Sequence, residues 1–422
     1  MKPVRSLPIL LGILFGLVLA AGALLLTPAV QRWALLRAMQ ARPDLQFEAA
    51  TVAASLFQVQ LGGVRFKQSG ITVQIGRLEA DYSLWQLLLK RQLVIGRLSG
   101  RGLLVDASKL SARRANAAAA GVPAAAPGLL TQIKLPVGLV LADCVLEGRV
   151  LLPGSTGGPP VEATCQISGG QIAPGQEGEL VLAADLKNPA AAARVTALRA
   201  ELRLRVRQTE QKTFSHVSLT AVVEAEGRDL PGQEHLKIAA SLAKTAGGEN
   251  YEFTVDTLLG GKAEKVLALN ATLPAGGKEY AGSWQLLARA AQLEPFFLGA
   301  GLPDFQARGE GRFSFTPGTG AVGLQGSLSA EVNRLEAWEP AWRAFGAVKL
   351  AAQFDVAGVD GVARLNQLHV SVAGDQPVLE LSAARGAEIN LKKRRLQPGS
   401  SAGGEALTLT LHGLPLAWVR PF

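Results

Sequence analysis

The chain has 422 residues, of which 48% are hydrophobic and only 5% are aromatic, and its formal net charge is +9. This composition excludes a disordered chain, because there is enough apolar surface to build a core and a membrane segment. A basic chain suits an anionic membrane surface or a nucleic acid. No basic cluster is interleaved with aromatic residues, so no nucleic-acid partner is expected.

The N-terminal stretch from Leu7 to Leu26 contains twenty residues and no charge. As a helix, at about 1.5 Å per residue, it would span about 30 Å, which is the hydrocarbon thickness of a bilayer. Lys2 and Arg5 precede it and favour a cytoplasmic N-terminus. Three arginines follow it on an amphipathic stretch that ends at Arg42, and they weaken that preference. The apolar run is longer than that of a cleaved signal peptide. We therefore interpret residues 1–42 as a signal anchor with a juxtamembrane helix.

Residues 43–110 have the clearest β pattern. Near-alternation of polar and β-branched or aromatic residues predicts strands in LQFEAATV, SLFQVQLGGVRF and ITVQIGRLEADY, with turns at Gly62-Gly63 and Ser69-Gly70. Ser83 is expected to cap a short helix, SLWQLLLK, and a pair of strands is expected within LVIGRLSGRGLLVDAS. This region is predicted to be an N-terminal β subdomain.

The composition changes abruptly at residues 111–128, SARRANAAAAGVPAAAPG, which predict an exposed linker and a subdomain boundary. Residues 129–422 are predicted to form an extended antiparallel β-region, interrupted by short helices at 291–299 and 337–345. Cys144 and Cys165 are the only cysteines, and the sequence leaves open whether they form a disulfide or stay free and buried.

About twenty strand candidates follow one another along the chain, and at about 4.8 Å per strand a single sheet would extend for about 100 Å. A sheet of that width must curl, twist or split. The fold class predicted is therefore mainly β: an N-terminal transmembrane helix, then a long curved antiparallel sheet with a few short helices.

The segment ELRLRVRQ alternates most strictly. Leu202, Leu204 and Val206 share one face of the strand, and charged side chains occupy the other. Two interpretations remain open. The apolar residues line an open groove that shelters acyl chains, or they form the core of an ordinary sandwich. A continuous apolar concave face would favour lipid, and a polar, water-filled one would favour a scaffold for other proteins.

No catalytic constellation is found. The four histidines form no HExxH motif or other short-spaced pair, and neither a GxSxG nucleophile elbow nor a P-loop is present. We therefore expect no catalytic residues, no metal, no cofactor and no enzymatic activity.

The order of elements up to Val105 resembles the bacterial AsmA-like family, which includes TamB-type proteins. The resemblance is carried by an apolar helix, an amphipathic helix, an alternating β run, and then a strand, a short Leu-rich helix and a further strand from Tyr82 to Val105. It implies a single-pass inner-membrane protein with its bulk in the periplasm, acting in phospholipid transport or outer-membrane biogenesis through an apolar β-groove. Its implied partners are phospholipid, the inner membrane, and outer-membrane or periplasmic proteins. The alternative is a non-enzymatic periplasmic scaffold or assembly factor.

Overall fold

The computed structural model describes residues 46–413 with internal gaps. The gaps are 49, 56, 69–70, 107, 109–137, 153–160, 188–194, 228–229, 231–233, 297–301, 338–339, 360, 384–385, 391–394 and 398–405. The predicted anchor, Leu7 to Leu26, and the predicted linker, 111–128, lie outside the described residues. Among the helices that are described, none has the length and apolar character needed to cross a bilayer.

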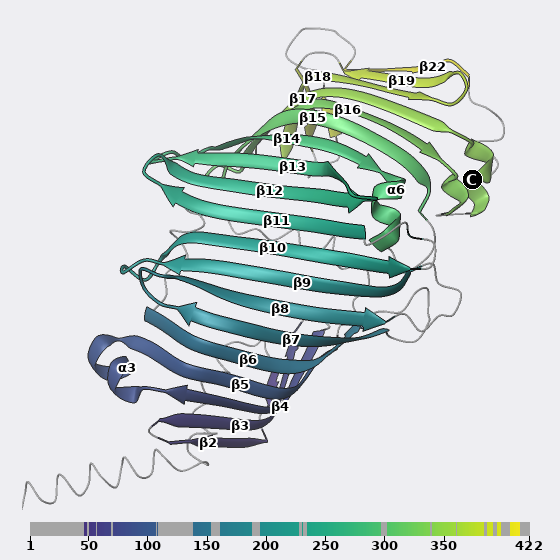
Figure 1. The fold of residues 1–422 in the computed structure, drawn as a ribbon. Coiled ribbons are helices and arrows are strands. Elements are labelled where there is room, and N and C mark those ends of the chain that lie inside the picture. Colours follow the sequence, from purple (N-terminus) through teal and green to yellow (C-terminus); the bar gives the residue numbers. More distant parts are fainter. Residues whose placement is uncertain are drawn as a thin grey trace, which may run out of the picture. The chain divides into compact units, whose positions relative to one another are not determined.

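The chain divides into two compact units, the first of which holds β1 to β7, helix α3 and β8 as far as Ala184. The bounds are β1 Gln46–Glu48, β2 Thr51–Ala54, β3 Gln58–Gln68, β4 Ile71–Tyr82, α3 Leu84–Lys90, β5 Gln92–Asp106, β6 Gly138–Leu152, β7 Val161–Ile172 and β8 Glu177–Lys187. The helix begins as predicted, because the Ser83 hydroxyl accepts a hydrogen bond from the backbone N–H of Gln86. Figure 1 shows α3 at one end of the strands, between β4 and β5.

One pair of strands departs from the predicted antiparallel arrangement. Strands β5 and β6 run parallel, with Val105 aligned with Val150. Parallel neighbours cannot be joined by a tight hairpin and need a long connection; in the sequence, β5 ends at Asp106 and β6 begins at Gly138. The pairing thus links strands on either side of the predicted linker, and the domain bounds drawn from the sequence stay predictions.

One predicted turn and one predicted pair of strands were wrong, because in each case a glycine lies inside a single strand. Gly63 has a φ of +59° within β3, where the register moves from Gly62 opposite Arg77 to Val64 opposite Ile75. Gly102 has a φ of +68° within β5, which is one strand and not the expected pair. Glycine reaches positive φ without a steric penalty, so it lets a strand bulge and continue.

The two cysteines are free and buried. Cys144 lies opposite Gly169, and Cys165 lies opposite Gly148, so the thiols are four residues out of register on neighbouring strands. At about 3.4 Å per residue their Cα atoms are too far apart for a disulfide. Burial raises the pKa of both thiols, and Asp143 raises that of Cys144 further.

The second unit holds the remaining strands. The strand bounds are β9 Val195–Gln208, β10 Phe214–Gly227, β11 Glu234–Thr245, β12 Gly248–Leu259, β13 Lys262–Pro274, β14 Tyr280–Arg289, β15 Asp304–Thr316, β16 Ala321–Asn333, β17 Val348–Val359, β18 Val362–Ala373, β19 Pro377–Ala383, β20 Ala387–Asn390, β21 Arg395–Gln397 and β22 Leu407–Leu411. The helical segments are α6 Ala290–Leu293, η3 Glu294–Phe296, η4 Leu335–Ala337 and η5 Pro340–Phe345. They fall at the two predicted interruptions.

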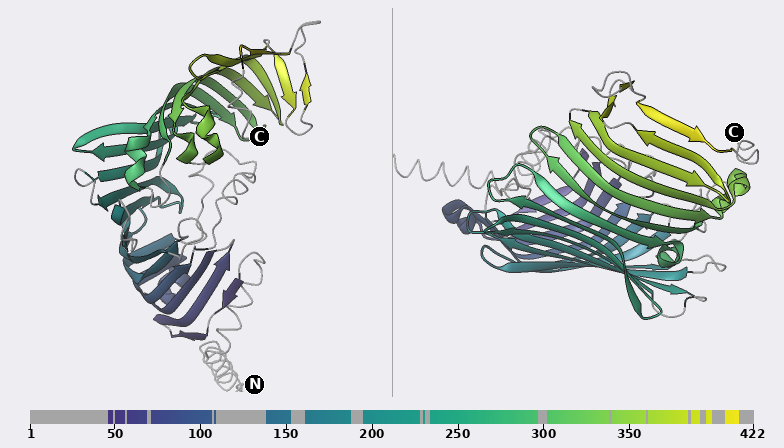
Figure 2. Two further views of the ribbon diagram at one scale, coloured as in Figure 1. Left: turned by 90° about the vertical axis from the view of Figure 1, so that its right-hand side faces the viewer. Right: turned by 90° about the horizontal axis from the view of Figure 1, so that it is seen from above.

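Strands β9 to β19 of this unit form an antiparallel meander in which each strand pairs with the next along the chain. Beyond it, β20 pairs with β18 and β22 pairs with β19. The sheet of the second unit is visibly curved (Figure 2, green to yellow). The prediction of a mainly β fold with a curved antiparallel sheet and few short helices is therefore confirmed.

Candidate functional site

The register of the second unit sorts side chains into an apolar face and a polar face. Residues directly opposite each other in antiparallel strands point to the same side of a sheet, so a row can be followed from strand to strand. One row runs Leu204, Leu219, Ala240, Phe253, Leu269, Trp284, Gly311, Gly326, Phe354 and Leu368. The next row runs Arg205, Ser218, Ser241, Glu252, Asn270, Ser283, Arg312, Gln325, Asp355 and Gln367. The first row contains no polar residue except the indole of Trp284, and the second contains no apolar one.

The predicted groove residues lie at the start of this apolar face. On β9, Leu202, Leu204 and Val206 point to the same side and are half-buried, opposite the apolar residues of β10. The arginines that alternate with them are exposed on the polar face. The structure therefore brings the three residues together on one face, as their alternation indicates, and their role in lipid binding stays a prediction.

The apolar face is open along its centre. Every member of the row from Leu204 to Leu368 is half-buried, and none is fully buried. In a sandwich, a second sheet packs against such a row about 10 Å away and buries it. In the described part of the chain these side chains pack mainly against their neighbours within the sheet, which favours an open surface over a sealed core.

A short helical segment, α6 with η3, covers one end of this face. Helix α6 contacts β12, β14 and β15, while η3 contacts β9 and β10. In a flat sheet, β9 and β15 would lie about 29 Å apart. Seven helical residues span only about 10 Å. The sheet must therefore curl around the segment at this end.

The position of Glu264 identifies the face that curls inward. Glu264 lies opposite Thr257, which points to the same, apolar side of β12 as Phe253 and Val255. The Gln292 side chain of α6 donates a hydrogen bond to Glu264, with Nε2 and Oε2 2.6 Å apart. Thr257 is 2% exposed beneath the segment. The apolar face is therefore the concave one where α6 and η3 close it.

Glu264 holds the α6–η3 segment against the apolar face. Besides accepting from Gln292, its Oε2 lies 2.8 Å from Nη2 of Arg289, and its Oε1 lies 3.3 Å from Nζ of Lys262. The hydrogen bonds from Gln292 and Lys262, together with the charges of Arg289 and Lys262, lower the pKa of Glu264. The carboxylate is thus the group that ties the end of β14 and α6 to β13.

Aromatic residues mark the opposite end of the strands. The rings of Tyr251 and Tyr280 meet edge to face at 5.4 Å, and Tyr280 stacks on Phe315 at 6.4 Å. The Tyr251 hydroxyl donates to the buried carboxylate of Glu249. The apolar face is therefore bounded along the strands by the α6–η3 segment at one end and by this aromatic cluster at the other.

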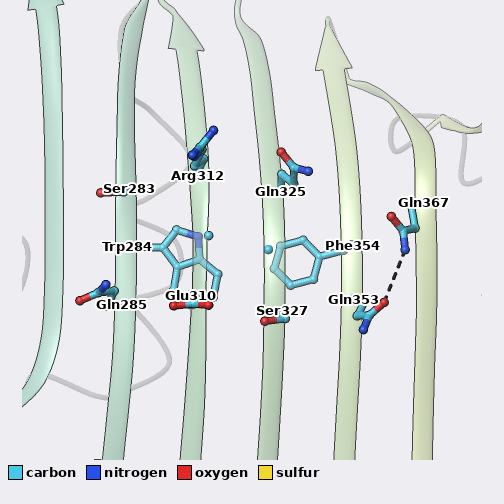
Figure 3. Close-up of a pocket in the computed structure, with 12 residues that line it drawn as sticks. Ser283, Trp284, Gln285, Glu310, Arg312, Gln325, Ser327, Gln353, Phe354 and Gln367 are labelled. Atoms are coloured by element: carbon cyan, nitrogen blue, oxygen red, sulfur yellow. Dashed lines mark hydrogen bonds between the residues drawn. The ribbon is translucent and has the colours of Figure 1, made fainter.

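A tryptophan lies flat across the middle of the apolar face. A Cβ on Gly311 would lie 2.7 Å from Nε1 of Trp284, and a Cβ on Gly326 would lie 2.9 Å from its Cζ2. The two glycines thus leave the room that the indole occupies. Trp284 reaches across β15, and Phe354 reaches back from β17 toward β16, with their rings parallel and 6.3 Å apart (Figure 3). The pair forms a continuous aromatic platform.

The polar face carries a hollow behind this platform, with a volume of about 570 Å³. Trp284, Gly311, Gly326 and Phe354 belong to its lining, together with eight polar residues that alternate with them along the strands. The polar residues are Ser283, Gln285, Glu310, Arg312, Gln325, Ser327, Gln353 and Gln367. The amides of Gln353 and Gln367 are joined by a hydrogen bond, drawn as a dashed line in Figure 3. This hollow suits water or polar groups and not acyl chains.

The histidines that the sequence offers are dispersed over the second unit. His216 and His369 lie within β10 and β18, where they are half-buried and exposed respectively. His235 lies 3.4 Å from a carboxylate oxygen of Glu224. In the described residues, no three His, Cys, Asp or Glu side chains are grouped so that they could hold a metal ion.

A family model described as the TamB N-terminal domain matches residues 17–148. The matched segment is about a third of the chain, and it includes α3, β5 and most of β6, the parallel partner of β5. The resemblance to TamB-type proteins inferred from the sequence is thereby confirmed over this segment. Searches of curated proteins and of solved structures each gave no significant match.

Sequence reasoning did not find the Trp284 platform. Trp284 lies in a strand predicted from YAGSWQLLARA, but its partners Gly311 and Gly326 are distant in sequence and meet it only through the register. A signal was nevertheless present. In the segment RGEGRF, Gly309 and Gly311 alternate with charged residues, so both glycines lie on the face opposite the charges and leave room there.

Proposed function

We propose that the chain is an inner-membrane-anchored protein of the bacterial envelope that carries phospholipid along the apolar face of its second unit. The observation that carries the proposal is the uninterrupted apolar row from Leu204 to Leu368, half-buried and without a covering layer in the described residues. The TamB N-terminal match supports an envelope role in lipid transport or outer-membrane assembly.

The energetics of such a face suit reversible lipid binding. Removing apolar surface from water is worth about 25 cal/mol per Å². An acyl chain that lies along the open row covers half-exposed side chains and is itself shielded from water. This gain in buried apolar surface offsets much of the free energy that the lipid loses when it leaves the bilayer. The headgroup stays in solvent at the rim of the face. No chemical step is required, so we propose that the protein is not an enzyme and uses no cofactor.

The predicted segment Leu7–Leu26 would place the N-terminus in the inner membrane and the β-region in the periplasm. In that arrangement phospholipid and the inner membrane are direct partners. Outer-membrane or periplasmic proteins would receive the lipid or hold the far end of the chain.

The test is native mass spectrometry of the full chain purified from bacterial membranes, with extraction and identification of bound lipid. Because a membrane anchor also retains lipid, the measurement compares Leu219→Asp on the apolar face with Ser218→Asp, its neighbour on the polar face. We expect phospholipid at a defined stoichiometry in the original chain and in Ser218→Asp, and a loss in Leu219→Asp. Equal lipid content in the three proteins would contradict the proposal.

A scaffold for periplasmic proteins is the second candidate, and the hollow on the polar face is the observation that favours it. Its lining of amide, hydroxyl and charged groups is suited to a polar protein segment. Two results would favour this function over lipid transport. The purified chain would carry partner proteins but no lipid, and the double variant Gln325→Ala with Gln353→Ala would lose those proteins.

A further inference from the structure

Helix α3 and the loop before β3 present the most exposed large apolar side chains in the described part of the chain. Leu89 is 76% exposed, Trp85 is 66% exposed and Phe57 is 64% exposed. Trp85 and Leu89 are four residues apart and therefore lie on the same side of the helix. Such exposure of a tryptophan and a phenylalanine together indicates a contact that the isolated chain does not satisfy. We call these three residues the α3 tip.

The tip is held firmly by the first unit. The backbone N–H of Tyr82 donates to the carbonyl of Phe57 at 2.8 Å, and the Tyr82 hydroxyl donates to the carbonyl of Ser55 at 2.6 Å. At the far end of the helix, the Gly138 N–H donates to the carbonyl of Arg91 at 3.1 Å. The helix and the loop are thus fixed at the same end of β3 to β6, and the helix projects there beyond the strands (Figure 1).

Basic residues follow the apolar ones directly. Lys90 ends the helix, and Arg91 caps it in the left-handed conformation; both are exposed, and neither forms an ion pair with another described residue. On the adjoining strand, the carboxylate residue Asp81 lies opposite Arg97 in the register. The tip therefore consists of apolar side chains with a basic collar.

The size of the tip decides between a protein and a bilayer as its partner. A stable protein interface buries about 800 Å² on each side, which is more than three side chains on a seven-residue helix can supply. A bilayer interface accepts single aromatic and aliphatic side chains, and anionic headgroups attract flanking Lys and Arg. The composition of the tip matches the bilayer.

The length of the chain also allows the tip to reach the membrane that the Leu7–Leu26 segment is predicted to span. The apolar segment ends at Leu26, and twenty residues later β1 begins at Gln46, so the connection reaches at most about 70 Å. We propose that the α3 tip inserts into the interfacial layer of the same bilayer that the Leu7–Leu26 segment spans, giving the first unit a second membrane contact. The inference rests on the membrane anchoring proposed above, and it is independent of lipid transport.

The test places an environment-sensitive fluorophore on a cysteine introduced by Leu89→Cys, in the full chain with Cys144→Ala and Cys165→Ala. The protein is reconstituted into vesicles of phosphatidylethanolamine and phosphatidylglycerol. The matched control is Val359→Cys, an exposed apolar position of the second unit that is 48% exposed. We expect a blue shift, a severalfold rise in emission and quenching by brominated lipid at residue 89, and water-like emission at residue 359.

Flotation of the vesicles separates the proposed anchor from the proposed tip insertion. Flotation shows whether the protein is bound to the membrane at all, and the fluorophore shows whether the α3 tip is inserted. Protein that floats but shows water-like emission at residue 89 overturns the second contact and leaves the anchor intact. Equal blue shifts at both positions overturn it as well, since they indicate association without specificity. Protein that does not float contradicts both proposals. Trp85→Cys serves as a second labelling position, and Lys90→Glu with Arg91→Glu is expected to reduce the signal.

Discussion

The two faces of the second unit differ in what holds them together. The polar face carries side-chain hydrogen bonds and exposed ion pairs, such as Arg199 with Glu226 at 3.1 Å. The groups that form them are also in contact with water. On the apolar face, the side chains from Leu204 to Leu368 are half-buried and have no second layer against them in the described residues. A single curved sheet thus leaves its apolar side chains about half-buried, and we propose that the surface still exposed binds a ligand.

The largest expected effect comes from placing charge on the apolar face. Leu204→Asp with Leu269→Asp should lower the affinity for phospholipid about a thousandfold or more, because each carboxylate would face an acyl chain at a cost of about 2–3 kcal/mol. Quantitative lipid extraction measures the loss. The control, Ser218→Asp with Ser283→Asp, adds the same charges to the polar face of neighbouring strands and should retain lipid. A collapse of the melting temperature in the first variant would indicate a sealed core instead.

A smaller effect, on stability, is expected for the glycines that lie under the Trp284 ring. Gly311→Val should lower the free energy of unfolding by about 1–3 kcal/mol, because its Cβ would meet both the Trp284 ring and the Gln325 carbonyl. Urea denaturation measures the change. Gly358→Ala on β17 has no contact closer than 3.6 Å and should leave stability nearly unchanged. Equal stability of the two variants would mean that the aromatic platform does not rest on the glycines.

The closure of the apolar face by α6 should depend on pH. The pKa of Glu264 is lowered in the folded protein, so the carboxylate stabilises the fold above its unfolded pKa near 4.5, and this stabilisation is lost as pH falls through the lower folded pKa. The melting temperature of Glu264→Gln should therefore lie below that of the original chain at neutral pH and approach it in acid. A difference that is constant with pH would contradict the role of the charge.

The smallest effect is expected for ion pairs of the polar face. Arg199→Ala on β9 removes the exposed pairs with Glu226, 3.1 Å away, and Asp185, 3.4 Å away, and should change the free energy of unfolding by at most about 1 kcal/mol. The change should vanish in high salt. Denaturation at two salt concentrations measures it, and a larger, salt-independent loss would show that polar contacts hold this face as firmly as packing holds the other.

Local patterns predicted much of this fold. The alternation around Leu202, Leu204 and Val206 identified the apolar face, and Ser83 predicted the start of α3. The glycines of β3 and β5 were misread because the same residue permits a turn or a bulge, and only the partner strand distinguishes the two. The parallel pairing of β5 with β6, the Trp284 platform and the curl around α6 depend on contacts between residues far apart in sequence, which periodicity does not report.

The most direct test of the central claim is site-specific photocrosslinking of the full chain in bacterial cells. A benzophenone amino acid is placed at Leu204 on the apolar face and, in a separate protein, at Arg205 on the polar face. Adducts are then identified by mass spectrometry. The account predicts phospholipid adducts at residue 204 and none at residue 205. Protein adducts alone at residue 204, or lipid adducts of equal yield at both positions, would contradict it.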